Sequence, residues 1–221
     1  MIVAIDGPAG AGKSTVARGV AEALGYAYID SGAMYRAVAW LARDAGVLMD
    51  SADGLAEVAR QHPMRFVRRD GRQVLMANGR ELDGEIRTPE ISHLSSVVSV
   101  VPAVREALVA QQRRMGSEGD VVMEGRDIGT VVFPGAEVKV FLTASEEERA
   151  RRRAEELQSR GEPVSLDQVR REVRERDARD QERAHSPLVP AKDAVEVSTD
   201  GLSVEQVIER ILEICREKRW A

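Results

Sequence analysis

The chain has one cysteine in 221 residues, Cys215, and this scarcity excludes a disulfide scaffold. Its three histidines, His62, His93 and His185, are too dispersed for an H-x-x-x-H metal site. Aromatic residues make up only 4% of the chain, which leaves few side chains for the stacking platforms that bind single-stranded nucleic acid. Disulfide-stapled, histidine-metal and base-stacking proteins are therefore the first classes to be excluded.

The chain also lacks an excess of positive charge, because it has 32 Lys and Arg residues against 37 Asp and Glu residues and its net charge is −5. This balance argues against bulk electrostatic binding of polymeric nucleic acid. No apolar run approaches the roughly 20 residues that span a bilayer, and the first run, Met1–Ile5, ends at Asp6 with no basic segment before it. We therefore expect a protein of the reducing cytoplasm that does not contact a membrane.

The 43% of hydrophobic residues is enough for a sizeable core, in one large domain or in one domain that carries an inserted lobe. Short apolar runs alternate with amphipathic helical patterns, which is typical of a parallel α/β sheet. A helix is predicted over Ser14–Leu24, ending at Gly25, and another over Ser203–Arg219, where Ser203 and Gln206 fit a capping box. Five runs predict the core strands: Ile2–Ile5, Tyr26–Ile29, Val121–Met123, Val138–Leu142 and Ala194–Val197.

One region breaks this alternation. Between Met64 and Leu82, the hairpin signals Asp70-Gly71 and Asn78-Gly79 separate three short strand-like runs and predict an antiparallel meander. Thr88-Pro89 then fits the cap and first residue of a helix, and a further helix is expected after Pro102. An antiparallel patch inside a parallel α/β chain indicates an inserted lobe, which we expect over residues 55–100.

A glycine-rich turn after the first strand carries the clearest chemical signal. The run Gly7-Pro8-Ala9-Gly10-Ala11-Gly12-Lys13-Ser14 fits G-x-x-x-x-G-K-[ST] at every fixed position, and Thr15 follows it. Glycines let the backbone curl around phosphate oxygens, while successive N–H groups and the helix N-terminus supply positive charge. Lys13 is expected to reach the β- and γ-phosphates and the Ser14 hydroxyl to ligate Mg²⁺. The motif, between a strand and a helix, predicts that the chain binds a nucleoside triphosphate.

The chain lacks the N-K-x-D element of switch GTPases, and it is too short for a motor ATPase with further domains. The acidic residue that follows a buried strand is Glu124, in Val-Val-Met-Glu. It is interpreted either as a carboxylate that holds the water shell of the magnesium ion or as a solvent-facing acid at a strand end.

Two further segments follow strands, where ligands of doubly wound sheets sit. The segment Asp30-Ser31-Gly32-Ala33-Met34-Tyr35-Arg36 offers a hydroxyl and a guanidinium for a phosphate. The segment Gly125-Arg126-Asp127 carries an Arg–Asp pair, for which substrate contact is favoured over a structural salt bridge. Arginines are dense over residues 149–183, where Arg149, Arg152 and Arg153 belong either to a solvated helix face or to a lid that closes over the triphosphate.

Together these segments resemble the bacterial cytidylate kinases, which transfer phosphate from ATP to CMP or dCMP. The resemblance rests on Ile5-Asp6-Gly7-Pro8 with the P-loop, the block 30–36, and Gly84-Glu85-Ile86-Arg87-Thr88. It continues through Val104-Arg105-Glu106-Ala107-Leu108, the run from Gly125 to Pro134, and Arg176-Asp177 to Pro187-Leu188-Val189-Pro190, and so spans nearly the whole chain.

The resemblance implies a doubly wound, five-stranded parallel sheet with an inserted nucleoside-monophosphate (NMP) lobe and a helical lid. The core would comprise residues 1–54, 101–148 and 184–221, with the lobe over about 55–100 and the lid over about 149–183. The chain would act as a monomer, with ATP as donor, Mg²⁺ as cofactor, and CMP and dCMP as acceptors.

The resemblance also assigns roles to residues. It assigns catalysis to Lys13, Arg126 and Arg183. It places Ser14 at the metal ion, and Glu124 there through water. ATP would be bound by Arg149 and Arg152 and by the P-loop residues Gly7, Pro8, Ala9, Gly10, Ala11, Gly12, Lys13, Ser14 and Thr15. The CMP phosphate would contact Ser31, Arg36, Arg126 and Arg183, with Tyr35 supporting that wall. Ser96, Arg105 and Asp127 would recognise cytosine, and Arg176 and Asp180 the ribose. Cytosine offers an amino donor beside two acceptors, which a carboxylate, a guanidinium and a hydroxyl complement.

Two other readings of the residues remain open at this point. A P-loop kinase that acts on a sugar or a shikimate-like alcohol would need a base for a neutral hydroxyl and fewer arginines on the acceptor side. An ATP-gated binding or regulatory module would bind ATP without turnover of an acceptor.

Overall fold

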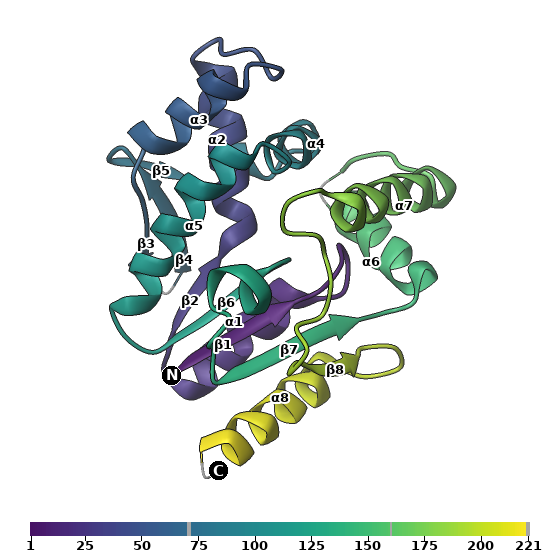
Figure 1. Cartoon of the computed structure of the whole chain (residues 1–221). Coiled ribbons are helices and arrows are strands. Elements are labelled where there is room, and N and C mark those ends of the chain that lie inside the picture. Colours follow the sequence, from purple (N-terminus) through teal and green to yellow (C-terminus); the bar gives the residue numbers. More distant parts are fainter. Residues whose placement is uncertain (70–71, 160, 220–221) are drawn as a thin grey trace. The chain divides into compact units, whose positions relative to one another are not determined.

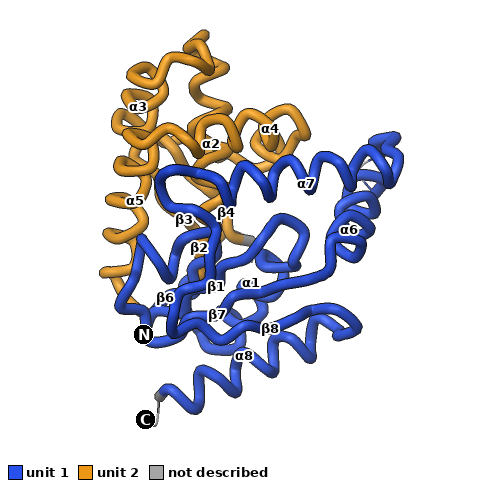
Figure 2. Tube along the Cα trace, turned by 45° about the vertical axis from the view of Figure 1, so that its right-hand side comes forward, with its two compact units in different colours: residues 1–27, 120–221 blue, residues 28–119 orange. Residues whose placement is uncertain are grey.

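The computed structural model describes residues 1–69, 72–159 and 161–219. It divides into two units, coloured separately in Figure 2. Unit 1 comprises Met1–Ala27 and Asp120–Ala221, and unit 2 comprises Tyr28–Gly119.

A five-stranded sheet with the order β2-β6-β1-β7-β8 forms the core of the fold (Figure 1). β1 (Ile2–Asp6) pairs in parallel with β6 (Val121–Gly125) and β7 (Val138–Thr143), and β7 pairs in parallel with β8 (Val195–Ser198); β2 is Ala27–Asp30. All of β6 is buried, and β1 is buried from Val3 onward. Strands covered on both faces need continuous apolar runs, so the expected parallel α/β sheet is confirmed.

Two helices of unit 1 pack against each other and against this sheet. They are α1 (Lys13–Leu24) and α8 (Val204–Arg219). α1 ends at Gly25, whose φ of 70° only glycine adopts at little cost. The capping box of α8 is confirmed, because Ser203 N donates to Gln206 Oε1 (2.8 Å) and Gln206 N donates to Ser203 Oγ (3.3 Å). Cys215 lies buried in α8, and burial raises the pKa of its thiol to about 11.

The arginine-rich stretch of unit 1 forms a pair of helices, α6 (Glu146–Ser159) and α7 (Leu166–Glu182). They bury a small core of their own, made of Ala150, Ala154, Leu157, Val169 and Val173. Many of the surrounding arginines face glutamates at the surface, as Arg153 does with Glu156 at 2.7 Å. Exposed pairs of this kind contribute little to stability.

Unit 2 combines helices with the expected meander. Its helices are α2 (Ser31–Asp44), α3 (Ala52–Gln61), α4 (Pro89–Val98) and α5 (Pro102–Ser117), and a 3₁₀ turn, η1, covers Gly84–Ile86. The strands β3 (Met64–Arg69), β4 (Arg72–Ala77) and β5 (Arg80–Leu82) pair antiparallel. The turn at Asn78-Gly79 is confirmed by φ values of 54° and 78°, whereas the turn expected at Asp70-Gly71 lies outside the described residues.

The core of unit 2 gathers large side chains from its helices and its sheet, among them Trp40, Leu55, Leu82 and Leu108. The expected cap of α4 is confirmed, because Thr88 Oγ1 accepts a hydrogen bond from Ile91 N at 3.2 Å. In the described part of the chain no single helix is long and apolar enough to cross a membrane; α4 and α5 reach that criterion only as a pair bent by 101°.

One buried carboxylate in unit 1 joins the end of β1 to a distant loop. Asp6, 5% exposed, accepts hydrogen bonds from the backbone N–H groups of Ile128 (2.9 Å) and Gly129 (2.8 Å). These groups begin η2 (Ile128–Val132), a single turn of π-helix. Burial raises the pKa of Asp6 to about 6, although the two N–H groups oppose the change.

This shift predicts a pH-dependent contribution of Asp6 to folding. A carboxyl group whose pKa rises on folding contributes most stability below its unfolded value of 3.8 and loses that contribution as pH rises through about 6. The free energy of unfolding of the protein, minus that of Asp6→Asn, should therefore fall by about 2 kcal/mol between pH 4 and pH 7. Urea unfolding of both proteins across this range measures the difference. A difference that stays constant or grows with pH would contradict the expected titration.

Candidate active site

The glycine-rich turn between β1 and α1 forms the expected phosphate cradle. Lys13 opens α1, and its Nζ donates a hydrogen bond to the carbonyl of Pro8 at 2.7 Å, so the lysine folds back across the loop. Ser14 and Thr15 follow it at exposed positions. The first backbone N–H groups of α1 therefore lie beside a lysine and two hydroxyl residues, which is a favourable setting for an anion.

Close packing explains why this turn needs glycine. A Cβ atom on Gly7 would overlap the carbonyl oxygen of Leu142 in β7. A Cβ on Gly10, whose φ is 78°, would lie 2.9 Å from Cβ of Arg149 in α6. The turn is therefore held between the sheet and the first turn of α6, with Arg149 directly against it.

Buried charges of both signs surround Lys13. Burial lowers the pKa of Lys13 to about 7, and the nearby Arg126 guanidinium adds to that lowering. The carboxylate of Glu124, itself 4% exposed at the end of β6, opposes it. An anion placed here would favour the charged form of Lys13, so the cluster suits phosphate oxygens.

A carboxylate from α7 holds Arg126 in place. Arg126 Nε donates to Asp180 Oδ2 at 2.8 Å, and Arg183 Nη2 lies 3.9 Å from the other oxygen of Asp180. Burial would raise the pKa of Asp180, but three arginines lower it below its ordinary value. They are Arg126, Arg176 and Arg183. Unit 1 thus brings the arginines predicted for catalysis and ribose binding around one carboxylate.

Asp127, predicted to recognise the base, lies next to this cluster in the chain. It is 4% exposed and immediately precedes η2, the turn that Asp6 fixes by its two hydrogen bonds. The negative charge of Asp127 is close enough to raise the pKa of Asp6 further. Asp6 therefore sets the backbone that carries Asp127.

The two arginines predicted at ATP both reach the P-loop from α6. Arg149 Nη1 donates to Ala9 O (3.2 Å) and to Asp177 of α7 (2.5 Å), while its Nε donates to Ala144 O (3.1 Å). Arg152 Nη1 lies 3.7 Å from the position of a Cβ on Gly12. The interpretation as a merely solvated helix face is therefore wrong for these two arginines, whereas Arg153 pairs with Glu156.

Unit 2 holds the other predicted substrate residues, beginning with an N-terminal cluster on α2. Asp30 caps the helix by accepting from Ala33 N (2.8 Å), and its second oxygen accepts from Arg36 Nη2 (2.9 Å). Burial would raise the pKa of Asp30, but Arg36 and the cap lower it. Ser31, 4% exposed, is the first residue of the helix. A helix N-terminus, a hydroxyl and a held guanidinium converge there, as an anion site requires.

Two residues of unit 2, Ser96 on α4 and Arg105 on α5, are predicted to recognise cytosine. Arg105 of α5 is 4% exposed, its Nη1 donates to Ser99 O at 3.1 Å, and its Cζ lies 5.4 Å from the centre of the Tyr35 ring. Ser96 of α4 is 5% exposed and donates to His93 O at 2.9 Å. Tyr35 thus supports Arg105, and both are held by other residues of unit 2.

Sequence reasoning missed the carboxylates and the hydroxyl that hold the predicted residues. Asp6 and Asp30 lie within the motifs described above, but the motifs assign them no function. Thr199 lies outside those motifs. A charged residue at the end of an apolar strand run is a visible signal for the first two. Nothing in the local pattern marks Thr199.

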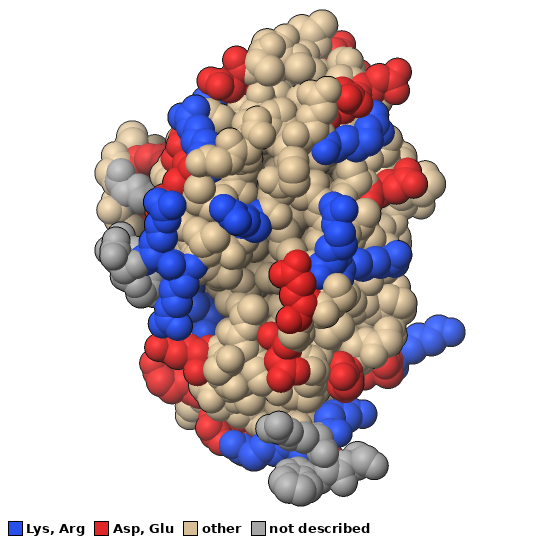
Figure 3. Space-filling model, turned by 90° about the vertical axis from the view of Figure 1, so that its left-hand side faces the viewer, with Lys and Arg blue, Asp and Glu red and all other residues tan. Residues whose placement is uncertain are grey.

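Charged side chains are distributed differently on the surface than in these buried clusters. On the face drawn in Figure 3, Lys and Arg side chains are interspersed with Asp and Glu side chains and with uncharged surface. The arginines on that face do not gather into one continuous basic patch.

Comparison with known proteins identifies the family of the chain. The family model described as cytidylate kinase matches residues 3–217. A cytidylate kinase of Syntrophotalea carbinolica is 50% identical over 99% of this chain and 93% of its own length. That of Geobacter sulfurreducens is 49% identical over 100% and 95%, and that of Desulfitobacterium hafniense is 47% identical over 98% and 93%. The chain belongs to the cytidylate kinase family.

Proposed function

We propose that the chain transfers the γ-phosphate of ATP to CMP and dCMP, with the residue roles set out below. The observation that carries the proposal is the buried cluster of Lys13, Glu124 and Arg126 beside the P-loop. Phosphoryl transfer needs positioned positive charge rather than covalent chemistry from the protein, and this cluster supplies it.

On the donor side, the P-loop backbone, Lys13 and the hydroxyls of Ser14 and Thr15 bind the ATP phosphates. Arg149 and Arg152 contribute positive charge from α6, which is consistent with their contacts around Ala9 and Gly12. Lys13 exchanges its hydrogen bond to Pro8 for one to a phosphate oxygen. The bound phosphates then hold Lys13 in its charged form.

The residues present fit a magnesium ion. Ser14 and, through water, Glu124 would hold it, and when bound it supplies positive charge at the β- and γ-phosphates. Among the residues that the structure describes, no group of three or more His, Cys, Asp or Glu side chains could hold a metal ion by itself. One hydroxyl, one carboxylate, water and phosphate oxygens form the donor set that Mg²⁺ prefers.

On the acceptor side, Ser31, Arg36, Arg126 and Arg183 bind the CMP phosphate, with Tyr35 behind them. Asp127 accepts a hydrogen bond from the cytosine amino group, while Ser96 and Arg105 satisfy the ring acceptors. Arg176 and Asp180 hold the ribose. Asp30 keeps Arg36 oriented through the 2.9 Å hydrogen bond and so acts as a positioning residue.

The phosphate of CMP attacks the γ-phosphorus of ATP in line with the leaving ADP oxygen. The second pKa of a nucleotide phosphate is about 6, so the phosphate is largely ionised at neutral pH. No general base is therefore required, and Lys13, Arg126 and Arg183 stabilise the charge of the transferring group. Closure of the NMP lobe (about 55–100) and of the lid (about 149–183) would exclude water and so prevent ATP hydrolysis.

The remaining expectations concern the setting of the enzyme. We expect it to act as a monomer in the cytoplasm. Its only cysteine is 2% exposed, which is compatible with a reducing compartment.

The proposed acceptor is tested by ADP release in the presence of CMP, dCMP, UMP, AMP and simple alcohols. Turnover should be fast with CMP and dCMP and slow with the others. Uracil lacks the amino donor that Asp127 accepts, adenine carries its amino group on a larger ring, and a simple alcohol lacks the phosphate that the acceptor-side arginines bind. ADP release with an alcohol, but with none of the nucleoside monophosphates, would indicate an alcohol kinase instead. ATP binding without any acceptor turnover would indicate a binding module.

Replacing Lys13 should abolish transfer without abolishing acceptor binding. In Lys13→Ala, kcat should fall at least about a hundredfold, because the γ-phosphate loses its main buried positive charge. CMP binding should remain measurable by calorimetry. Lys192→Ala, at an exposed position, is the matched control and should retain full turnover. Normal turnover in Lys13→Ala would refute the P-loop assignment.

Replacing Asp127 should relax the choice of base. In Asp127→Ala, the ratio of kcat/KM for CMP to that for UMP should fall about tenfold to a hundredfold, because the cytosine amino group loses its acceptor. The exposed Asp44→Ala in α2 provides the control for a lost negative charge. An unchanged ratio in Asp127→Ala would remove the role in base recognition.

A further inference from the structure

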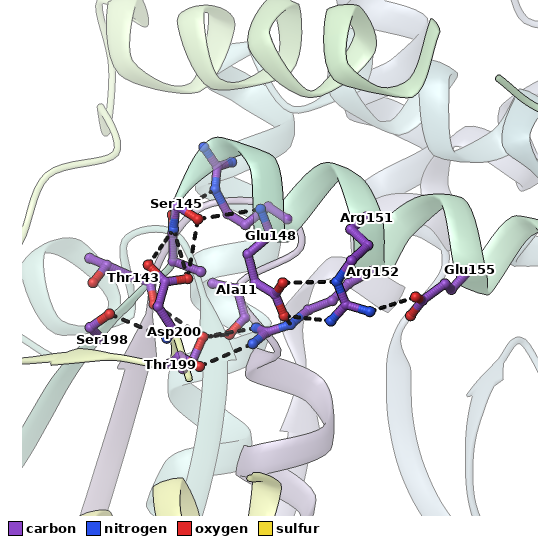
Figure 4. Close-up of polar contacts among 12 residues, drawn as sticks. Ala11, Thr143, Ser145, Glu148, Arg151, Arg152, Glu155, Ser198, Thr199 and Asp200 are labelled. Carbon is purple, nitrogen blue, oxygen red and sulfur yellow. Dashed lines mark hydrogen bonds and ion pairs between the residues drawn. The ribbon is translucent and has the colours of Figure 1, made fainter. Parts of the chain in front are cut away.

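The turn between β8 and α8, whose first residue is buried, contacts both the P-loop and α6 within unit 1 (Figure 4). Its first residue, Thr199, is 3% exposed. Thr199 N donates to Thr143 O at the end of β7 (2.9 Å), so the turn is fixed to the sheet. The next residue, Asp200, accepts two contacts from Ser145 N, at 2.9 and 3.1 Å, just before α6 begins. The turn therefore meets α6 at its start and again at Arg152, about two helical turns further on.

The second contact is a fork between Arg152 and Thr199. Arg152 Nη1 donates to Thr199 Oγ1 (2.8 Å), and Arg152 Nη2 donates to Thr199 O (3.1 Å). Arg152 Nε donates to Glu148 on the same helix (2.8 Å). Each terminal nitrogen of a guanidinium carries two N–H groups, so each retains one more donor after these bonds. The guanidinium is oriented by the protein and still able to bind an anion.

The Thr199 hydroxyl also joins this guanidinium to the P-loop. Its oxygen accepts from Arg152, and its single proton can go to Thr143 O (3.2 Å) or to Ala11 O (3.5 Å). Arg152 Nη1 lies 3.7 Å from the Cβ position of Gly12, so the fork holds the charge over the phosphate cradle. A single Glu–Arg pair within one helix, such as the half-buried Glu148–Arg152, restricts a long side chain only weakly.

We propose that Thr199 is a positioning residue that holds Arg152 over the P-loop, where its remaining N–H groups meet the phosphates of the donor nucleotide. The inference rests on the proposed role of Arg152 in binding ATP. The hydroxyl does not touch the substrate; it orders a flexible arginine before ATP arrives. Removing the hydroxyl should therefore weaken the donor side of the reaction and leave CMP binding intact.

The experiment compares Thr199→Val, which keeps the shape and removes the hydroxyl, with Thr199→Ser, which keeps the hydroxyl. In Thr199→Val, kcat/KM for ATP should fall about tenfold, as expected for the loss of a hydrogen bond to a charged group. KM for CMP should not change, and Thr199→Ser should stay within about twofold of the parent. Thermal unfolding of each variant reports any purely structural loss.

A double-variant cycle shows whether Thr199 acts through Arg152. Arg152→Ala should lower kcat/KM for ATP, and the pair Thr199→Val with Arg152→Ala should be no worse than Arg152→Ala alone. Glu155→Gln, at an exposed partner of Arg151, is the control for altered charge on α6 and should retain full activity. If Thr199→Val does not fold, Thr199→Ala takes its place in the same cycle.

Three results would overturn the inference. If Thr199→Val has the activity of the parent while Arg152→Ala is impaired, Arg152 needs no positioning and its role in binding ATP stands. If Thr199→Val lowers kcat/KM for ATP by the same factor in the Arg152→Ala variant as in the parent, Thr199 acts through another group. If Arg152→Ala itself matches the parent, the proposed role of Arg152 fails and the inference fails with it.

Discussion

The buried positive charge of Lys13 is the constraint on which the rest of unit 1 depends. An ammonium group that is 6% exposed and faces the guanidinium of Arg126 is stable only with negative charge nearby. Glu124 and Asp180 supply part of that charge, and the carbonyl of Pro8 accepts a hydrogen bond from the ammonium. The remaining deficit of negative charge is what a triphosphate would fill. In the proposed mechanism, catalytic power and a cost in folding therefore arise from the same few side chains.

The residues of unit 2 that we propose to bind the acceptor are also held in place by neighbouring groups. Arg36 is already oriented by Asp30, which also caps α2, so one carboxylate fixes both the helix start and the guanidinium. Arg105 lies over the Tyr35 ring and donates to a backbone carbonyl. Side chains held in this way lose little further conformational entropy when a ligand binds. Preorganisation thus comes from residues that a list of substrate contacts would leave out.

Most of the fold could be predicted from local patterns. Continuous apolar runs gave the strands because β6 and most of β1 are buried on both faces. Gly25, Thr88 and the Ser203–Gln206 box fixed helix ends because caps depend on neighbours within a few residues. The hydrogen bonds that Ile128 N donates to Asp6 and that Arg152 donates to Thr199 join residues 122 and 47 positions apart. No single-sequence periodicity encodes such contacts, so the supporting residues became visible only in three dimensions.

The burial of Cys215 has a practical consequence for studying motion in this enzyme. Its thiol is 2% exposed and has a pKa raised to about 11, so very little thiolate forms near neutral pH and reagents reach it poorly. The protein therefore behaves toward maleimide dyes almost as if it contained no cysteine. A cysteine introduced at an exposed position of α7 could carry a fluorophore without removal of the native thiol. The movement of a helix could then be followed in an otherwise unmodified chain.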